Sequence, residues 1–173
     1  MSSVQIENKI RPLVLEDLDA IFRIDHEIRR RGQAVTYANL TTEHVFGIDR
    51  HVGILGTPLS YADLIKGDIS ELLEFGLVAE VENHVRGFVL GRIGHCSDTT
   101  AGIGTIAILG VHPDYQHRGL AGHLMNGLCE TYRSKGIKRV RVNVDRRDKL
   151  MTDFVEYMGF GVGHLIDYTK VLT

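Results

Sequence analysis

The sequence predicts a mixed α+β domain built on a central, mostly antiparallel sheet with helices on both faces. Consecutive strands within 76–111 imply antiparallel pairing of neighbours in the sheet. A strand–helix–strand unit over 103–144 implies a parallel, right-handed crossover. Two amphipathic helices, at 16–31 and 118–135, each have an apolar side that can cover a sheet. At 173 residues the chain has the usual size of one domain, so we expect a single domain over 1–173.

In the first half, a short strand is predicted at 10–14 and a helix at 16–31. Apolar residues recur at spacings of three and four along that helix, and Gly32 follows as its terminator. The pattern is poor from 33 to 58, apart from a helical turn at 44–48. Residues 60–73 read as one broken helix or two short ones.

The second half has clearer patterns. Strands at 76–81 and 85–93 are joined by a tight connection at 82–84, and a polar turn at 96–101 leads to a strand at 103–111. That strand is apolar nearly throughout and is therefore expected to be central. The remaining predicted elements are a helix at 118–135 that ends at Gly136, a strand at 140–144, a helix at 148–158 and a last strand at 161–172.

Composition excludes several classes of protein. A net charge of -2 and a pI of about 6.5 provide no global basic field for nucleic acid or a membrane surface. No apolar run approaches the ~20 residues that span a bilayer, and 1–9 is too polar for a signal peptide. Two cysteines, Cys96 and Cys129, favour a reduced cytoplasmic setting. The nine histidines lack metal-site spacing, so no metal is expected.

The junction after the strand 103–111 indicates a ligand site. The chain turns at Pro113, and a helix is predicted to begin with Arg118 and Gly119. The first amides of a helix have no intrahelical partner and carry the positive end of its dipole. Glycines at 119 and 122 allow close approach to the backbone, which suits a pyrophosphate. The alternative is a tight strand-to-helix turn whose glycines serve packing alone.

The same junction resembles a known family. Gln-His-Arg-Gly-Leu-Ala at 116–121 matches the Gln/Arg-x-x-Gly-x-Gly/Ala signature of the GNAT acyl-CoA N-acyltransferases. Val-His-Pro at 111–113 matches the strand end that precedes that signature. Similar segments at 10–18, 87–91 and 159–160 extend the resemblance over most of the chain, whereas 33–73 has no clear match. The resemblance implies a GNAT-like fold.

The resemblance also implies a coenzyme site. Acetyl-CoA would be the co-substrate. Its pantetheine would pair with the strand edge at Leu109, Gly110 and Val111, and an amide near Leu109 or Gly110 would stabilise the oxyanion. The pyrophosphate would lie on the backbone amides of Gln116, His117, Arg118, Gly119, Leu120, Ala121 and Gly122.

The catalytic side chains are less clearly indicated. Val155 stands where the family often has a tyrosine that protonates the leaving thiolate, so that acid is not expected here. Glu80, on a strand facing the expected cleft, is the first candidate for the base that deprotonates the amine. Asp145, at a strand end, is the second. The alternatives are a solvent-facing Glu80 and a turn residue at Asp145.

We therefore expect an N-acetyltransferase that moves the acetyl group of acetyl-CoA to a primary amine by direct attack in a ternary complex. The acceptor is an amine-bearing protein, peptide or small molecule, with a protein N-terminal or lysine amine favoured and a small-molecule amine as the alternative. Dimerisation through the last strand is left open. Two other classes remain. A catalytically degenerate acyl-CoA-binding sensor would fit Val155, and a nucleic-acid-binding module would fit the basic segment 133–149.

Overall fold

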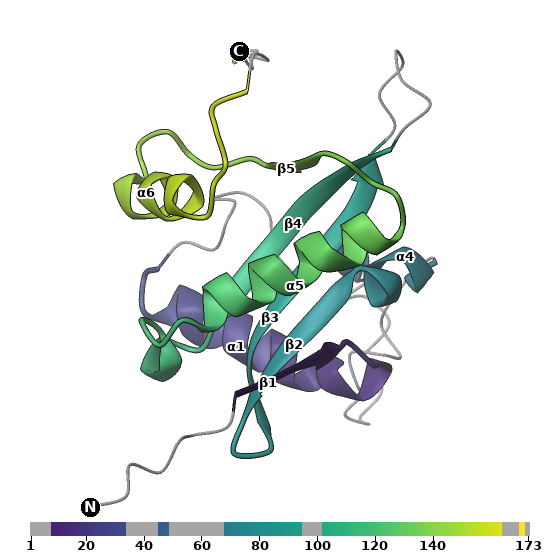
Figure 1. Cartoon of the computed structure of the whole chain (residues 1–173). Helices are drawn as coiled ribbons and strands as arrows, with labels where there is room; N and C mark the ends of the chain where they lie inside the picture. Colours follow the sequence, from purple (N-terminus) through teal and green to yellow (C-terminus); the bar gives the residue numbers. More distant parts are fainter. Residues whose placement is uncertain (1–7, 34–44, 49–67, 95–101, 164–169, 172–173) are drawn as a thin grey trace, which may run out of the picture. The chain divides into compact units, whose positions relative to one another are not determined.

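The computed structural model describes residues 8–33, 45–48, 68–94, 102–163 and 170–171 (Figure 1). The chain divides into two compact units, 1–143 and 144–173. The single domain expected from the sequence stays a prediction. The described elements of the first unit are β1 (Asn8–Pro12), the 3-10 helix η1 (Leu15–Asp17), α1 (Leu18–Arg30), α4 (Ser70–Glu74), β2 (Gly76–Val81), β3 (His84–Gly94), β4 (Ile103–Val111), the 3-10 helix η3 (Pro113–Tyr115), α5 (Leu120–Ser134) and β5 (Val140–Val142). The second unit contains α6 (Lys149–Tyr157).

The sheet has the order β1-β2-β3-β4-β5. The first four strands pair antiparallel, and β5 joins β4 in parallel. This arrangement confirms the predicted mixed, mostly antiparallel sheet, and the parallel connection runs from β4 through α5 to β5. The ladder between β4 and β5 is short, because it ends where Ile106 pairs with Val142.

Two β-bulges interrupt the antiparallel part of the sheet. Ala79 pairs with Gly87 and Glu80 with Val85, so Arg86 is the extra residue of β3. In the next ladder Leu90 pairs with Ile108 and Gly91 with Ile106, so Ala107 is the extra residue of β4. Bulges redirect side chains and often lie beside functional sites.

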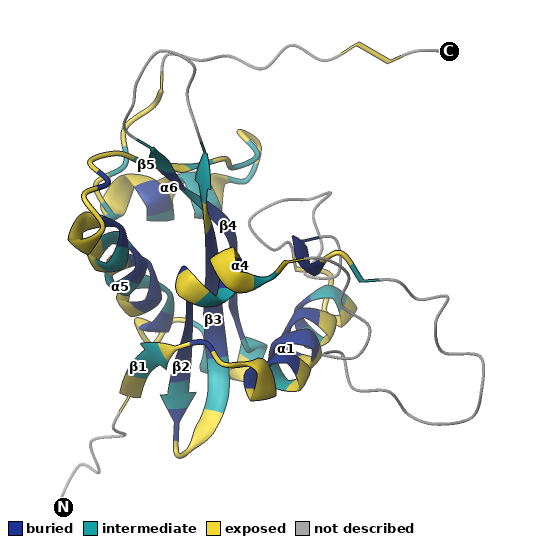
Figure 2. Ribbon diagram, turned by 90° about the vertical axis from the view of Figure 1, so that its right-hand side faces the viewer, coloured by how far each residue is buried: buried dark blue, intermediate teal, exposed yellow. Residues whose placement is uncertain are grey.

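Helices α1 and α5 cover opposite faces of the sheet, as predicted. Figure 2 shows the strands between the two helices, with the buried side of each helix turned toward the sheet. On one face, α1 contributes Ile21, Ile24 and Ile28 to a core that also holds Phe88, Leu90 and Ile108. On the other, the predicted stripe of α5 is fully buried at Leu124, Met125, Leu128 and Tyr132. Burial of such side chains contributes roughly 1.5–3 kcal/mol each.

Tyr132 packs tightly onto the sheet where two strand glycines leave it room. A Cβ at Gly104 would lie 2.8 Å from three atoms of the Tyr132 ring, and one at Gly91 would overlap its hydroxyl oxygen. That hydroxyl faces two backbone carbonyl oxygens, of Arg92 at 3.0 Å and Thr105 at 2.8 Å. Burial raises the pKa of Tyr132 well above its usual value, so the hydroxyl keeps its proton as a donor.

Several predicted boundaries shift for local reasons. The first strand ends at Pro12 because the carboxylate of Asp17 accepts the Val14 amide at 3.0 Å, which starts the 3-10 turn. The hairpin connection is two residues long, since Glu82 and Asn83 both have positive φ, at 52° and 62°, as in a type I′ turn. The helix predicted from Arg118 begins at Leu120 because Gly119 has a φ of 81°.

Other predicted elements are only partly covered by the structure. Val45 and Phe46 are helical, in agreement with the predicted turn at 44–48. Within 60–73 the described residues contain the start of α4, and residues 60–67 lie outside them, as does the turn at 96–101. The strand predicted at 161–172 is absent from its described residues, 161–163 and 170–171. A strand needs a neighbour, and Gly161 and Gly163 have no atom within 4 Å of an added Cβ.

An ion-pair network joins β1, η1 and β2. The guanidinium of Arg11 donates to both carboxylate oxygens of Asp17 and to Oε1 of Glu80, each at 2.7 Å. Asp17 is only 6% exposed. Burial alone raises the pKa of Asp17, but hydrogen bonds from Arg11 and the Val14 amide together with the charge of Arg11 outweigh it, so this pKa lies below its usual value.

Replacing Gly104 tests the packing of Tyr132. Gly104→Ala should lower the free energy of unfolding by about 1–3 kcal/mol, because the added methyl group must displace a fully buried ring. The matched control is Gly94→Ala, whose Cβ would make contacts of 3.7–3.8 Å, which are ordinary. Urea unfolding of both variants measures the difference, and an equal loss in the two would contradict this account.

Replacing Arg11 tests the network. Arg11→Ala should lower the free energy of unfolding at pH 7 by about 3 kcal/mol, because it leaves the Asp17 carboxylate buried without its cation. Glu80→Gln should cost about 1 kcal/mol or less, since Glu80 is more exposed and Arg11 keeps Asp17.

The cost of Arg11→Ala should also depend on pH. A lowered folded-state pKa of Asp17 gives stability that is complete above the unfolded value of about 3.9 and is lost as the pH falls toward the folded value. In the variant, burial raises the same pKa, so the protein regains stability as the pH falls. The gap between wild type and variant should therefore narrow between pH 7 and pH 4, and a constant gap would show that Asp17 does not carry the effect.

Candidate functional site

The turn that follows β4 is held in place by its own side chains. Nδ1 of His112 accepts the Asp114 amide at 3.3 Å, and Nε2 of Gln116 donates to the Val111 carbonyl at 3.1 Å. The end of α1 also holds the turn, because Arg31 donates to the Asp114 carboxylate at 2.9 Å. These bonds fix the turn to the end of β4 and to the end of α1.

The backbone of this turn forms a concave set of N–H groups. His117 and Gly119 have positive φ, at 59° and 81°, while Arg118 between them does not. Alternation of this kind makes successive amides converge, which is the geometry of an anion-binding nest. A positive φ at a non-glycine residue such as His117 is uncommon and is often kept at functional sites.

The amides of this turn are also available to a ligand. The first intrahelical bond of α5 joins the His123 amide to the Gly119 carbonyl at 3.1 Å. Among the described residues, the backbone amides of 117–122 find no acceptor. These amides and the positive end of the α5 dipole provide the environment that a diphosphate requires.

Arg118 adds a full positive charge beside these amides. Its Nη2 donates to the Asp114 carbonyl at 3.0 Å, and its guanidinium carbon lies 4.9 Å from the centre of the Tyr115 ring. The guanidinium of Arg86 lies 4.8 Å from the same ring. A cation over an aromatic face is held electrostatically while its N–H groups stay open to other partners.

The predicted strand edge directly precedes this turn. Leu109, Gly110 and Val111 form the last residues of β4, past the point where its ladder with β5 ends at Ile106. The strands therefore stop pairing before β4 reaches the turn. Gly110 faces α1, since a Cβ there would lie 2.7 Å from the Phe88 ring and 3.3 Å from Ile28.

Both predicted bases have hydrogen-bond partners of their own. Glu80 is on β2, which β3 separates from β4, so two strand spacings of about 4.8 Å lie between them. Its Oε1 accepts from Arg11. Asp145, in the second unit, accepts from the side chain and the amide of Arg147, and these bonds lower its pKa to about 2. A carboxylate with so low a pKa takes up a proton less readily than an ordinary one.

The metal, cysteine and tyrosine candidates can be checked only among the described residues. No group of three or more His, Cys, Asp or Glu among the described residues could hold a metal ion. Burial raises the pKa of the Cys129 thiol, which argues against a nucleophile, and Cys96 lies outside the described residues. Val155 is buried in α6, and Tyr157, two positions on, is 86% exposed. No helix in the described part is long and apolar enough to cross a membrane.

Sequence reasoning missed the part of this region that lies toward α1. Arg86 and Tyr115 meet only because the bulge in β3 places Arg86 beside the end of β4, where its carbonyl accepts the His112 amide at 2.8 Å. The available indication in the sequence is a charged residue, Arg86, directly before the apolar run 87–91 of this strand.

Comparison with known proteins identifies the fold and the family. The model of the acetyltransferase (GNAT) family matches residues 49–160, which include β4, the turn and α5. An aminoglycoside acetyltransferase, meta-AAC0020, from an uncultured soil metagenomic sample has a TM-score of 0.67 and 17% identity over 99% of this chain and 100% of that chain. The aminoglycoside N-acetyltransferase AAC(6')-Iy in complex with CoA has a TM-score of 0.64 and 14% identity over 95% of each chain.

A third solved structure is the ribosomal-protein-alanine N-acetyltransferase of Brucella melitensis biovar Abortus 2308. It has a TM-score of 0.63 and 16% identity over 96% of this chain and 100% of that chain. At such low identities these likenesses show the fold alone. The family match, however, covers more than half of the chain and includes the turn with the unpaired amides. This chain belongs to the GNAT family of acetyl-CoA-dependent N-acetyltransferases.

Proposed function

We propose that this protein transfers the acetyl group of acetyl-CoA to a primary amine by direct attack in a ternary complex, and that a protein N-terminal or lysine amine is the favoured acceptor. The observation that carries the proposal is the turn after β4, where His117 and Gly119 turn a row of unpaired amides into a nest beside Arg118. Joining both reactants in one complex removes much of the entropic barrier, so few catalytic side chains are needed.

The residues around the turn fit the coenzyme. Its diphosphate would be held by the backbone amides of 117–122, with Arg118 as a neighbouring cation. The amide of Gln116, which the sequence also predicts to contribute, donates to the Pro113 carbonyl at 3.4 Å instead. Gly119 leaves this place open, because an added Cβ would meet no atom closer than 3.8 Å. When bound, acetyl-CoA supplies a thioester as the acyl donor.

The end of β4 would receive the pantetheine and the thioester. The strand continues past the last residue paired with β5, so the coenzyme would lie along Leu109, Gly110 and Val111. A strand amide near Leu109 or Gly110 would donate to the oxyanion that forms as the amine attacks. The thiol of CoA, with a pKa of about 8.5 for an ordinary thiol, leaves tolerably as a thiolate, so Val155 in place of a tyrosine does not prevent turnover.

Removal of the amine proton is assigned to Glu80, acting through water. A lysine amine has a pKa of about 10.4 and an α-amine about 8, so the protein must take up or relay a proton from the ammonium form. Because β3 lies between Glu80 and β4, a direct contact with the amine is not expected. Oε1 of Glu80 also accepts from Arg11. Asp145 is the second candidate, and its hydrogen bonds from Arg147 lower its pKa to about 2.

Release of free thiol with a panel of acceptors tests the activity. The panel contains peptides with free N-terminal amines, peptides with an internal lysine and a blocked N-terminus, polyamines and aminoglycosides. We expect acetyl-CoA turnover above hydrolysis with at least one peptide class. Turnover with small amines alone would move the assignment to a small-molecule acetyltransferase, and CoA binding without release for any amine would indicate a sensor.

The same assay tests the proton route through Glu80. With the best acceptor, Glu80→Gln should lower kcat/KM at low pH and move the acidic limb of the pH profile, while the affinity for CoA stays unchanged. A profile identical to wild type would assign proton removal to solvent, or to Asp145 if Asp145→Asn moves the limb instead.

Two glycines at opposite ends of α5 provide a matched test of the coenzyme site. Gly119→Ala and Gly136→Ala both place a side chain at positive φ, at 81° and 79°, so both should destabilise by about 1–2 kcal/mol. Only Gly119→Ala distorts the unpaired amides, and it should weaken CoA binding by about tenfold or more, since hydrogen bonds to a charged group are strong. Calorimetric titration measures the affinities, and equal affinities in the two variants would contradict a diphosphate at the turn.

A further inference from the structure

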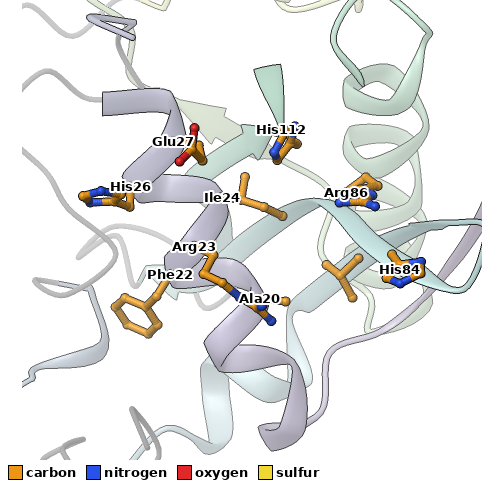
Figure 3. A pocket seen from close by; sticks show the side chains of 10 residues that line it. Ala20, Phe22, Arg23, Ile24, His26, Glu27, His84, Arg86 and His112 are labelled. Carbon is orange, nitrogen blue, oxygen red and sulfur yellow. The ribbon is translucent and has the colours of Figure 1, made fainter. Parts of the chain in front are cut away.

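A second concave site lies between α1 and the adjoining ends of β3 and β4, with a volume of about 550 Å³. Figure 3 shows His84, Arg86 and His112 on its strand side, and Arg23 and Glu27 on the side of α1. None of the residues 116–122 lines it, so it is distinct from the turn proposed for the coenzyme diphosphate. Its described lining is Ala20, Phe22, Arg23, Ile24, His26, Glu27, His84, Val85, Arg86 and His112.

Within the described part of the chain, the positive charge of this pocket has no matching set of carboxylates. The three arginines at the end of α1 each have a carboxylate partner, namely Asp25, Glu27 and Asp114. In contrast, Arg23 and Arg86 have no ionic partner within the described residues, and Arg23 donates to the Asp19 carbonyl instead. The single carboxylate of the lining, Glu27, already accepts from Arg30 at 2.9 Å. Two guanidinium groups therefore belong to a lining whose one described carboxylate already has a cationic partner.

Arg86 is held there by the fold. It is the extra residue of the bulge in β3, and its carbonyl accepts the His112 amide at 2.8 Å. Its guanidinium lies over the Tyr115 ring, and its Nε is buried with no hydrogen-bond partner in the described structure. A buried N–H that lacks an acceptor is unfavourable, and an anion in the pocket would supply one.

His112 supplies a directed donor to the same pocket. Because its Nδ1 accepts the Asp114 amide at 3.3 Å, the proton of the neutral ring must be on Nε2. The Nδ1 atom is also 3.8 Å from the Asp114 carboxylate, which is too long for a hydrogen bond and leaves that assignment unchanged. A neutral His112 therefore offers an N–H to a ligand.

We propose that this pocket binds a small anion, the phosphate or carboxylate group of a small molecule, separately from the coenzyme diphosphate. Arg23, Arg86 and His112 provide the donors, and guanidinium groups match the geometry of both oxyanions. A polycation such as an aminoglycoside is disfavoured there by the same charges. The Tyr115 ring, which holds Arg86 and Arg118 at similar distances, links the pocket to the turn.

The anion has two possible sources with the same chemistry. It belongs either to the acceptor, as an acidic group near the reactive amine, or to a free effector. The first source rests on the proposed function, whereas anion binding itself does not.

Titration of inorganic phosphate into the full-length protein saturated with CoA tests the site. We expect saturable binding to wild type. Arg86→Gln and Arg23→Gln should each weaken it by about tenfold, as expected for loss of a charged donor. The control is Arg133→Gln, which removes one positive charge from the exposed side of α5 and should leave phosphate binding unchanged. Thermal unfolding of each variant shows that a loss of binding does not reflect loss of the fold.

Three results would overturn the proposal. The first is that the CoA-loaded wild-type protein shows no saturable binding of phosphate. The second is that phosphate binds the CoA-free protein but is displaced when CoA is added. The third is that Arg23→Gln, Arg86→Gln and Arg133→Gln all bind phosphate with equal affinity. If the site is present, inhibition kinetics identify the source. Competition of phosphate with the amine indicates an acidic acceptor, and non-competitive inhibition indicates an effector. An enzyme inactive with every amine would refute the proposed function and leave the phosphate titration intact.

Discussion

Close packing of α5 against the sheet is the constraint on which the candidate site depends. Tyr132 fits between the helix and the strands because Gly91 and Gly104 have no side chain at the contact. Its hydroxyl spans the backbone of β3 and β4 through the carbonyls of Arg92 and Thr105. The buried side of α5 continues through Leu128 and Leu124 to Leu120 in its first turn, so the helix is packed along its whole length. The amides of 117–122 lie at that end of the helix.

Arginine charges separate into two groups with different consequences. Arg11, Arg29, Arg30 and Arg31 each lie beside a carboxylate, and the ion pairs of Arg11 with buried Asp17 and with Glu80 join three elements of the fold. Arg23, Arg86 and Arg118 bond to backbone carbonyls or lie over the Tyr115 ring. A paired charge serves stability, whereas a charge without a counter-ion is available to an anionic ligand. Both proposed binding sites lie where the second group is found.

Both carboxylates predicted to accept the amine proton are engaged by arginine side chains. Glu80 is a carboxylate on a strand near the expected cleft, yet its closest partner is Arg11, and β3 lies between it and β4. Asp145 is similarly engaged by Arg147. An amine acceptor with a pKa near 8 loses its proton to water more readily than a lysine does, so an α-amine makes the smallest demand on either carboxylate. The choice of acceptor therefore decides how strong a base the enzyme needs.

The sequence by itself determined the order of strands and helices, the amphipathic faces and the motif at 116–121, because periodicity and glycine positions are local properties of the chain. Local rules misplaced the start of α5, since the positive φ of His117 and Gly119 belongs to the turn between β4 and the helix and is not predicted by helix propensity. Only the tertiary structure decided the bulge at Arg86, the pairing of Glu80 with Arg11 and the meeting of Arg86 with Tyr115. Each of these joins residues from separate segments, and their distance in space follows from strand register, which no local pattern contains.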